Sequence, residues 1–468
     1  MNAVPDIGRR AAVPAQDYDP LYDPLVDATP GRNRAYAPTY WVATAGTPPD
    51  DDGPVQSDLD ADVVIIGSGF TGLTCALFLA REHGIKATVL EANQVAWGCS
   101  TRNGGQGQNA SGRLTRSQWV ARWGQETALR LHTEIQEGFE LFTSLVAEFP
   151  CDAQPGGHLY IAHRRRTLER LAVESEVANR VFGYRTRILD RAALDRDWVR
   201  EEEAAGALHE PSGIGVHPAK LAFGYLRAAR AVGARVHTGS PVQAITRDAG
   251  GWRVRTPGGT VRARAVAVAT GGYTSQGLHA RLRSRVMPIL SNSLVTRPLT
   301  DAEIAATGFR TRQVITDTRV LRHYYRLLPD NRLQIGSRSA ITGADAANPR
   351  HLRRLVDGMG AKFPALRGIA VDYSWWGWVD VSHDMMPRIV QPDPGETLFY
   401  AVGYGGNGVS YSAQAGRRLA ELVAGRPARH AVPIFQGELP GHAFAPFRRL
   451  GQRMLYQLYQ RRDDKPDL

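Results

Sequence analysis

The 468-residue sequence predicts a mixed architecture, in which an α/β unit with a parallel sheet is interleaved with an α+β unit built on an antiparallel sheet. Three observations predict it. A buried strand, a glycine-rich turn and a helix follow one another over residues 61–80, and a second apolar strand ends in a glycine turn at residues 265–272. Strands of alternating polarity lie within residues 285–340. Continuous apolar runs are typical of parallel strands buried on both faces, whereas alternation indicates antiparallel strands with one solvated face.

The first element is a glycine motif at the strand-to-helix turn. Gly67, Gly69 and Gly72 have G-x-G-x-x-G spacing. The first glycine permits the tight turn, the second lets the backbone approach a pyrophosphate, and the third lets the helix pack closely on its strand. A second strand, residues 87–90, ends at Glu91, where a carboxylate accepts hydrogen bonds from an adenosine ribose. Together these elements predict a Rossmann-type βαβ unit that binds a dinucleotide.

Two further glycine-rich segments fit a large polar ligand. The loop of residues 96–106 contains too much glycine for a packed helix or strand, and it offers backbone amides, a hydroxyl and a guanidinium. Residues 403–408 open a helix over residues 409–423. The partial positive charge of this second helix N-terminus suits the other end of a long cofactor.

Composition narrows the function classes. The chain is 43% apolar and 22% charged, which is typical of a globular protein, and its net charge is +11. Only four lysines occur and the arginines are spread along the chain, so we do not expect nucleic-acid binding. No run approaches the roughly 18 apolar residues of a membrane span, and no signal peptide is evident, so a cytoplasmic protein is expected. Three scattered cysteines predict neither a disulfide framework nor a metal site.

These motifs recur in order along nearly the whole chain, which resembles the D-amino-acid-oxidase-like superfamily of FAD enzymes and, within it, most closely the bacterial gamma-glutamylputrescine oxidoreductases. The segments that carry the resemblance are residues 71–80, 97–106, 269–273, 324–326, 330–333, 376–380 and 403–416. The resemblance implies an FAD-binding domain of three sequence pieces, residues 58–112, 208–284 and 365–430, and an antiparallel-sheet substrate domain, residues 113–207 and 285–364. We expect residues 1–57 to be an extended arm that Tyr36, Tyr40 and Trp41 hold to the body, and residues 431–468 to pack on the body.

The motifs and the resemblance together predict a set of FAD contacts. The expected contacts are Gly67, Gly69, Phe70, Thr71, Gly72, Glu91, Ala92, Gly98, Cys99, Ser100, Arg102, Asn103, Gly104, Gly105, Gln106, Val242, Thr270, Gly271, Trp376, Gly405, Gly406, Asn407, Gly408 and Val409.

The reaction that the resemblance implies is oxidation of the C–N bond of an amine to an imine, by hydride transfer to flavin N5. Its substrate would be a gamma-glutamyl-polyamine-like or secondary amine. An aromatic and polar set, His323, Tyr325, Trp376 and Tyr404, is the predicted catalytic group, although each of the four also fits a packing role.

Departures from the wider family refine this prediction. Some sarcosine oxidases attach flavin to a cysteine where Gly377 stands here, and other relatives use a histidine where Arg102 stands, so noncovalent FAD is expected. The arginine that holds the substrate carboxylate in amino-acid oxidases is replaced by Leu328, with Arg326 as a candidate substitute. Gln334 replaces a lysine that promotes oxygen reduction, which leaves oxygen and a quinone-type acceptor both open.

Two alternatives remain. One is an NAD-dependent dehydrogenase that uses the same βαβ unit. The other is an imino-acid or D-amino-acid dehydrogenase that passes electrons to a membrane quinone. The second is favoured by the segment of residues 447–462, where Leu450, Met454, Leu455 and Leu458 lie among arginines, as in a helix that rests on a membrane surface. The sequence does not indicate an oligomeric state.

Overall fold

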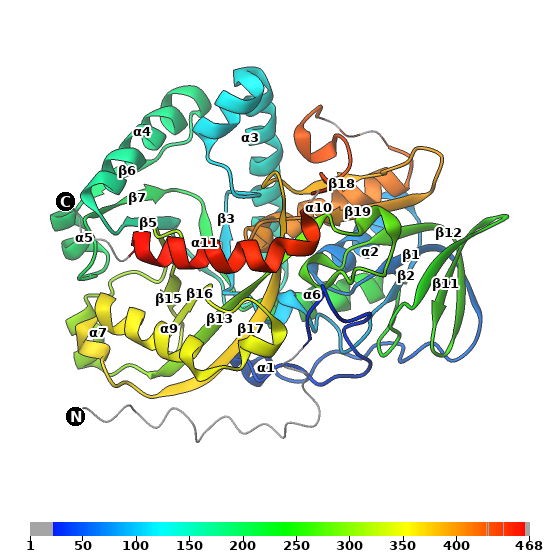
Figure 1. Cartoon of the computed structure of the whole chain (residues 1–468), viewed down its shortest axis with the longest axis horizontal. Helices are drawn as coiled ribbons and strands as arrows, with labels where there is room; N and C mark the ends of the chain where they lie inside the picture. The colour runs from blue at the N-terminus through cyan, green and yellow to red at the C-terminus, as the bar shows by residue number, and fades with distance from the viewer. Residues whose placement is uncertain (1–21, 427, 429, 443, 464–468) are drawn as a thin grey trace.

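The computed structural model describes residues 22–426, 428, 430–442 and 444–463, and two large sheets organise them (Figure 1). The first sheet has a parallel centre, in which β1 pairs with both β2 and β12, and antiparallel ribbons at its margins. Its strands are β10 (Ala244–Asp248), β11 (Gly251–Thr256), β12 (Gly259–Val268), β1 (Leu59–Ile66), β2 (Ala87–Leu90) and β9 (Arg235–His237), with β19 (Leu398–Val402) and β18 (Arg388–Val390) continuing from β12.

The parallel centre forms because its strands are almost entirely apolar. All four residues of β2 and the last four of both β1 and β12 are buried. The helices α2 (Phe70–His83) and α10 (Gly408–Val423) pack on this sheet, α6 (Pro218–Ala231) packs on α2, and α3 (Arg116–Glu148) packs on α10. The apolar strand predicted from residue 265 is the second half of β12, which begins at Gly259; the first half of β12 pairs with β11 and the second half with β19.

The second sheet is mostly antiparallel, as the alternating polarity predicted. Its order is β17 (Val371–Ser382), β13 (Val286–Pro298), β16 (Arg332–Ser337), β15 (Tyr324–Leu327), β14 (Val314–Asp317), β5 (His158–Ala162), β7 (Gly206–Glu210) and β6 (Arg187–Asp190). Its accompanying helices are α4 (Arg165–Phe182), α5 (Arg191–Asp197), α7 (Asp301–Thr307), α8 (Gly343–Ala346) and α9 (Pro349–Lys362). The predicted boundary at residue 365 differs from this topology, because β17 is hydrogen-bonded along β13 in the second sheet.

A small third sheet consists of β3 (Gln106–Gln108), β8 (Gly213–Gly215) and β4 (Gln154–Pro155). Each of these strands lies in a chain segment that leads from one large sheet to the other. The pairing of β3 with β8 places the glycine-rich loop before β3 next to the segment that leads into α6.

Both terminal segments pack on the body. The arm carries the short helix α1 (Tyr40–Thr44), and Tyr40 and Trp41 are buried as expected. The helix α11 (Arg448–Asp463) lies across the molecule in Figure 1, and Arg449 forms an ion pair with Asp23 of the arm at 2.9 Å. The part of the predicted arm before residue 22 is outside the described residues. No helix in the described part of the chain has the length and apolar character needed to cross a membrane.

A buried ion cluster holds α9 to the second sheet. The Lys362 ammonium, which is fully buried, lies 2.6 Å from a carboxylate oxygen of Glu201 and 2.9 Å from one of Asp317. Burial alone would raise the pKa of Asp317, but Lys362 and the neighbouring His323 and Arg319 hold it well below its usual value. Removing the lysine would leave two buried carboxylates without their main counter-charge.

We therefore predict that Lys362→Met lowers the free energy of unfolding by about 3–5 kcal/mol. Lys220→Met is the matched control, because Lys220 pairs with Asp152 at the partly exposed surface and its loss should cost at most about 1 kcal/mol. Urea denaturation of both variants measures this difference, and equal losses in the two variants would contradict the prediction.

The stability that Asp317 contributes also depends on pH. Since the pKa of Asp317 is lower in the folded than in the unfolded state, its contribution to the free energy of unfolding is present above the unfolded pKa and is lost as the pH falls through the folded pKa.

Candidate active site

The main cavity opens at the carboxyl ends of the parallel strands. Ile66 of β1 is in register with Leu90 of β2 and Val268 of β12, so these strands end side by side. Polar residues and glycines follow immediately after each strand and line the cavity. This edge is the expected ligand position in an open parallel sheet.

The G-x-G-x-x-G turn leaves no room for side chains. Gly67 has φ +100°, and a Cβ atom there would lie 2.8 Å from the carbonyl oxygen of Ala269. At Gly72, a Cβ atom would lie 1.9 Å from the Gly67 carbonyl oxygen. Gly69 is the N-cap of α2, and it lines the cavity together with Phe70 and Thr71, the first residues of the helix. The Phe70 amide donates to Ser100 Oγ at 3.0 Å. Gly72 itself does not line the cavity; its role is close packing of the turn on the helix.

Glu91 lies beside this turn, as predicted. Its carboxylate accepts hydrogen bonds from the Ser68 amide (3.0 Å) and hydroxyl (2.7 Å) and from the Asn93 amide (3.1 Å). Burial raises the pKa of Glu91, against the opposing effect of these donors. The carboxylate therefore holds the glycine turn in place, and Glu91 also lines the cavity.

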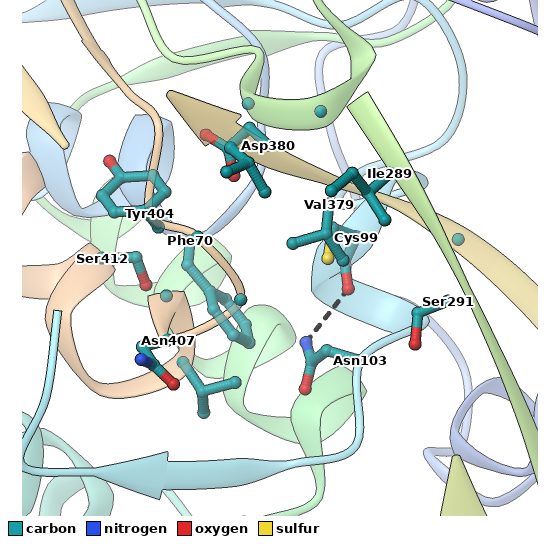
Figure 2. A pocket seen from close by; sticks show the side chains of 18 of the residues that line it. Phe70, Cys99, Asn103, Ile289, Ser291, Val379, Asp380, Tyr404, Asn407 and Ser412 are labelled. Carbon is teal, nitrogen blue, oxygen red and sulfur yellow. Dashed lines mark hydrogen bonds between the residues drawn. The ribbon is translucent and has the colours of Figure 1, made fainter. Parts of the chain in front are cut away.

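The loop of residues 96–106 forms one wall. The Arg102 guanidinium stacks on Trp97 with its central carbon 4.1 Å from the ring centre, and its Nε donates to the Trp97 carbonyl. The Asn103 amide donates to the Cys99 carbonyl at 3.0 Å (Figure 2). Burial raises the pKa of the Cys99 thiol to about 12, so this cysteine is a neutral thiol rather than a thiolate nucleophile.

The second glycine-rich turn forms the opposite wall. The Tyr404 hydroxyl lies 2.9 Å from Thr71 Oγ1, so it links the loop before α10 to the start of α2. Asp380 also lines the cavity; its carboxylate accepts a hydrogen bond from the Gly403 amide, and burial raises its pKa. Figure 2 shows Tyr404, Asp380 and Asn407 around the same open space as Phe70 and Cys99.

Side chains of the second sheet complete the cavity. Ile289 and Ser291 of β13 and Tyr324 of β15 line it. The Tyr324 hydroxyl lies 2.8 Å from Ser291 Oγ and 2.9 Å from Ser293 Oγ, and burial raises its pKa. The cavity is therefore continuous from the Rossmann-type turn to the antiparallel sheet.

Three of the four predicted catalytic residues lie elsewhere. Tyr325 faces the core of the second domain and bonds the Glu201 carboxylate, because successive residues of a strand point to opposite faces. His323 bonds Asp317, and Trp376 packs against an aromatic cluster while the adjacent Gly377 lines the cavity. Tyr404 alone of the four lines the cavity, and Tyr324 takes the place expected for Tyr325.

Arg326 is also not a substrate ligand in this structure. It is 1% exposed, and its guanidinium donates to the Gly104 carbonyl, the Val216 carbonyl and the Gln154 side chain. Burial lowers its pKa to about 10. Its hydrogen bonds position the Gly104 loop, which lines the cavity.

The residues present fit FAD. All the predicted FAD contacts line the cavity except Gly72, Gly105 and Trp376. Several buried polar atoms of residues that line the cavity have no hydrogen-bond partner among the described residues; they include Gln106 Oε1, Asn109 Oδ1 and Ser412 Oγ. Since buried polar groups are normally paired, such atoms indicate a large polar ligand. Sequence reasoning missed Asp380, Asn109 and Tyr324, of which Asp380 and Tyr324 belong to segments that the resemblance had already marked.

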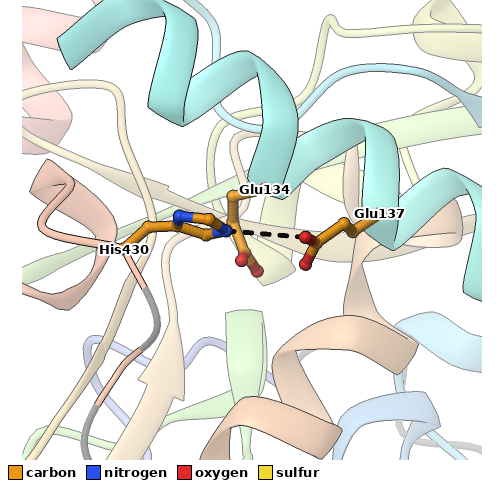
Figure 3. A group of neighbouring side chains, drawn as sticks. All are labelled: Glu134, Glu137 and His430. Carbon is orange, nitrogen blue, oxygen red and sulfur yellow. Dashed lines mark ion pairs between the residues drawn. The ribbon is translucent and has the colours of Figure 1, made fainter. Parts of the chain in front are cut away.

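A group of metal-ligating residues outside this cavity is already neutralised by an arginine. Glu134, Glu137 and His430 meet beside α3 (Figure 3). The Arg418 guanidinium lies 2.8 Å from a Glu134 carboxylate oxygen and 2.6 Å from one of Glu137. The arginine supplies the positive charge at this position, so the group indicates no metal.

Comparison with known proteins agrees with the fit of the cavity to FAD. The family described as FAD dependent oxidoreductase matches residues 62–422. The chain is 34% identical over 378 residues to the gamma-glutamylputrescine oxidoreductase of Escherichia coli strain K12, covering 79% of this chain and 85% of that protein. It is 28% identical over 401 residues to the sarcosine oxidase subunit beta of Rhizobium meliloti strain 1021, covering 79% and 86%.

A solved structure shows the same fold. The glycine oxidase of Geobacillus kaustophilus superposes with a TM-score of 0.69 at 21% identity, covering 82% of this chain and 99% of that one. The glycine turn, the continuous cavity and the family match over most of the sequence lead to one conclusion: the chain belongs to the FAD-dependent oxidoreductase family, and FAD is its cofactor.

Proposed function

We propose that this flavoenzyme oxidises the C–N bond of an amine, of the gamma-glutamyl-polyamine-like or secondary type, to an imine. One observation carries the proposal: the cavity that begins at the glycine turn of α2 continues without a break to Tyr324 and Ser291 of the second sheet. A substrate held by the second sheet therefore shares one cavity with the cofactor. The identity to the Escherichia coli gamma-glutamylputrescine oxidoreductase supports an amine as substrate.

The chain supplies positioning rather than covalent chemistry. Bound FAD would supply the hydride acceptor for the carbon that bears the amine, and the imine so formed would be hydrolysed by water. Tyr324 is held by its two serine partners, so its ring is a fixed wall for the substrate. Ile289 and Val379 provide apolar surface beside it and keep water away from the reacting carbon. An apolar wall also favours the neutral amine, which is the form that can donate a hydride.

We further propose that FAD is held without a covalent bond. No histidine or cysteine stands at the two attachment positions, which Arg102 and Gly377 occupy. The cavity does contain the Cys99 thiol, but its raised pKa disfavours the thiolate that attachment would require.

The glycine turn provides the first test of FAD binding. We predict that Gly69→Asp abolishes flavin content, because it places bulk and negative charge where α2 faces a pyrophosphate. Gly250→Asp is the matched control, since a Cβ atom at that exposed turn meets nothing within 4 Å. The ratio of flavin absorbance to protein absorbance after purification measures the effect. A Gly69→Asp protein as yellow as the control would refute this position for FAD.

A pair of neighbouring tyrosines tests the substrate wall. We predict that Tyr324→Phe slows anaerobic flavin reduction by about tenfold, through loss of the hydroxyl that fixes the ring. Tyr325→Phe should leave that rate nearly unchanged but lower the free energy of unfolding by about 1–3 kcal/mol, because the buried Glu201 loses a donor. Stopped-flow absorbance and urea denaturation separate the two effects. Slower flavin reduction in Tyr325→Phe, with an unchanged rate in Tyr324→Phe, would instead identify Tyr325 as the catalytic tyrosine.

The substrate class is tested by anaerobic bleaching. The yellow enzyme is mixed with polyamines, gamma-glutamyl amines, N-methyl amines and cyclic imino acids. We expect gamma-glutamyl or secondary amines to bleach the flavin fastest. Bleaching by NADH alone, with no response to any amine, would favour a different reaction class.

A second candidate function follows from α11. Leu450, Met454 and Leu458 are 60%, 65% and 59% exposed, so this helix turns apolar side chains outward among its arginines. Such a surface suits an imino-acid or D-amino-acid dehydrogenase that reaches a membrane quinone. Flotation with vesicles of anionic lipid tests it. The wild type should float and Leu450→Glu/Met454→Glu should not if this candidate is correct, whereas an enzyme that stays in solution and is reoxidised by oxygen excludes it.

A further inference from the structure

Three arginines converge on the substrate end of the cavity. Arg113 follows β3, Arg322 precedes β15, and Arg338 follows β16, and all three line the same space as Tyr324. The register of the second sheet accounts for part of this arrangement, because Tyr324 pairs with Gly336. Continuing that antiparallel register by two residues puts Arg322 opposite Arg338, a like-charge pair that costs stability unless an anion is present.

The three guanidiniums have few partners of their own. Arg113 donates to the Gly405 carbonyl at 3.1 Å, Arg322 donates to the Tyr160 hydroxyl at 2.6 Å, and Arg338 donates to the Val320 carbonyl. These acceptors are all neutral, and Arg322 Nε is buried without a hydrogen-bond partner among the described residues. None of the ion pairs found in the described part of the chain joins a carboxylate to these arginines.

Their mutual repulsion is considerable. Arg338 and burial, with a smaller effect of Arg322, lower the pKa of Arg113 to about 9. Burial lowers the pKa of Arg338; Arg322 adds a smaller lowering, which the neighbouring Tyr456, Tyr459 and Asp463 oppose. Tyr456 of α11, 5% exposed, lies near Arg113 and Arg338 and partly offsets the lowering of their pKa values. Half-buried positive charges that gather at one cavity, with neutral groups as their hydrogen-bond acceptors, are the arrangement that a bound anion would relieve.

We propose that Arg113, Arg322 and Arg338 form a carboxylate subsite, and that the amine substrate of this enzyme carries a carboxylate that binds there. This inference rests on the proposed function and names its substrate class more closely. Guanidinium groups suit a carboxylate because each presents paired N–H donors in a planar fork.

The subsite differs in position from the one expected by resemblance. The position where amino-acid oxidases carry their carboxylate-binding arginine is Leu328, beyond the far end of β15 from Arg322. Six residues of extended chain separate the two positions, or about 20 Å. A carboxylate held at the Arg322 end belongs to a substrate of different length or orientation from a simple α-amino acid bound at the Leu328 end.

Calorimetric titration of the FAD-containing enzyme tests the subsite without turnover. The probes are glutaramate, which has one carboxylate, and glutaramide, its neutral analogue. We expect the wild type to bind glutaramate at least tenfold more tightly than glutaramide. Arg322→Gln and Arg338→Gln should each weaken glutaramate about tenfold and leave glutaramide unchanged. Arg264→Gln, which alters an exposed arginine paired with Asp62 on the first sheet, should change neither value. Equal affinity of the wild type for the two probes would overturn the subsite.

Thermal unfolding distinguishes a ligand-binding role of the arginines from a structural one. If the arginines serve the ligand rather than the fold, Arg338→Gln should keep its flavin and unfold at the same or a higher temperature without ligand, because repulsion is relieved. A clear fall in unfolding temperature would overturn the proposal in favour of a structural role.

Flavin reduction shows whether the subsite belongs to the substrate site. Anaerobic reduction by gamma-glutamylputrescine is compared with reduction by the analogue in which hydrogen replaces its carboxylate. A preference of at least tenfold for the carboxylated amine, lost in Arg338→Gln, supports the subsite as part of the substrate site. Amines that bleach the flavin with no such preference overturn the subsite alone, whereas glutaramate binding without bleaching by any amine overturns the proposed reaction alone.

Discussion

Close backbone packing around the start of α2 is the constraint on which the rest of the structure depends. The turn at Gly67 approaches Ala269 of the neighbouring strand, and Gly72 approaches the turn itself. On the other side of α2, a Cβ atom at Gly416 of α10 would lie 2.1 Å from Thr74 Oγ1. The helices α2 and α10 can therefore pack against each other with both N-termini at the cavity. Any side chain at these positions would separate the strand ends from the helix ends that face the ligand.

The cavity joins two electrostatically different ends. Helix N-termini, backbone amides and the side chains of Glu91, Arg102 and Asp380 line the cofactor end, where burial keeps Cys99 and Tyr404 protonated. The far end carries arginines with neutral acceptors as their partners. Between them lies the apolar and hydroxyl-bearing wall of β13, β15 and β17. Such a division lets one enclosed space orient a polar substrate while its reacting carbon stays in apolar surroundings.

Sequence reasoning could predict the cofactor half because that half depends on local pattern. The spacing of Gly67, Gly69 and Gly72, and the helix after residue 408, each carry a short-range physical requirement. The substrate half depends on sheet geometry that a single strand does not reveal. Alternation places Tyr324 and Tyr325 on opposite faces, but only the pairing of β15 with β14 and β16 decides which one meets the cavity. The same pairing brings Arg322 and Arg338 together, and Arg113 reaches the cavity from the loop between β3 and α3. The boundary error at β17 has a similar origin, since its motif contacts the cofactor end while its hydrogen bonds belong to the second sheet.

A crystal structure of the yellow enzyme with glutaramate bound is the most direct test that one cavity serves both cofactor and substrate. We predict FAD in contact with Gly67, Gly69 and the glycine turn at residues 403–408, and the carboxylate of glutaramate against Arg322 and Arg338 in the same cavity. FAD at another position, or glutaramate bound outside the space lined by Tyr324, would contradict it.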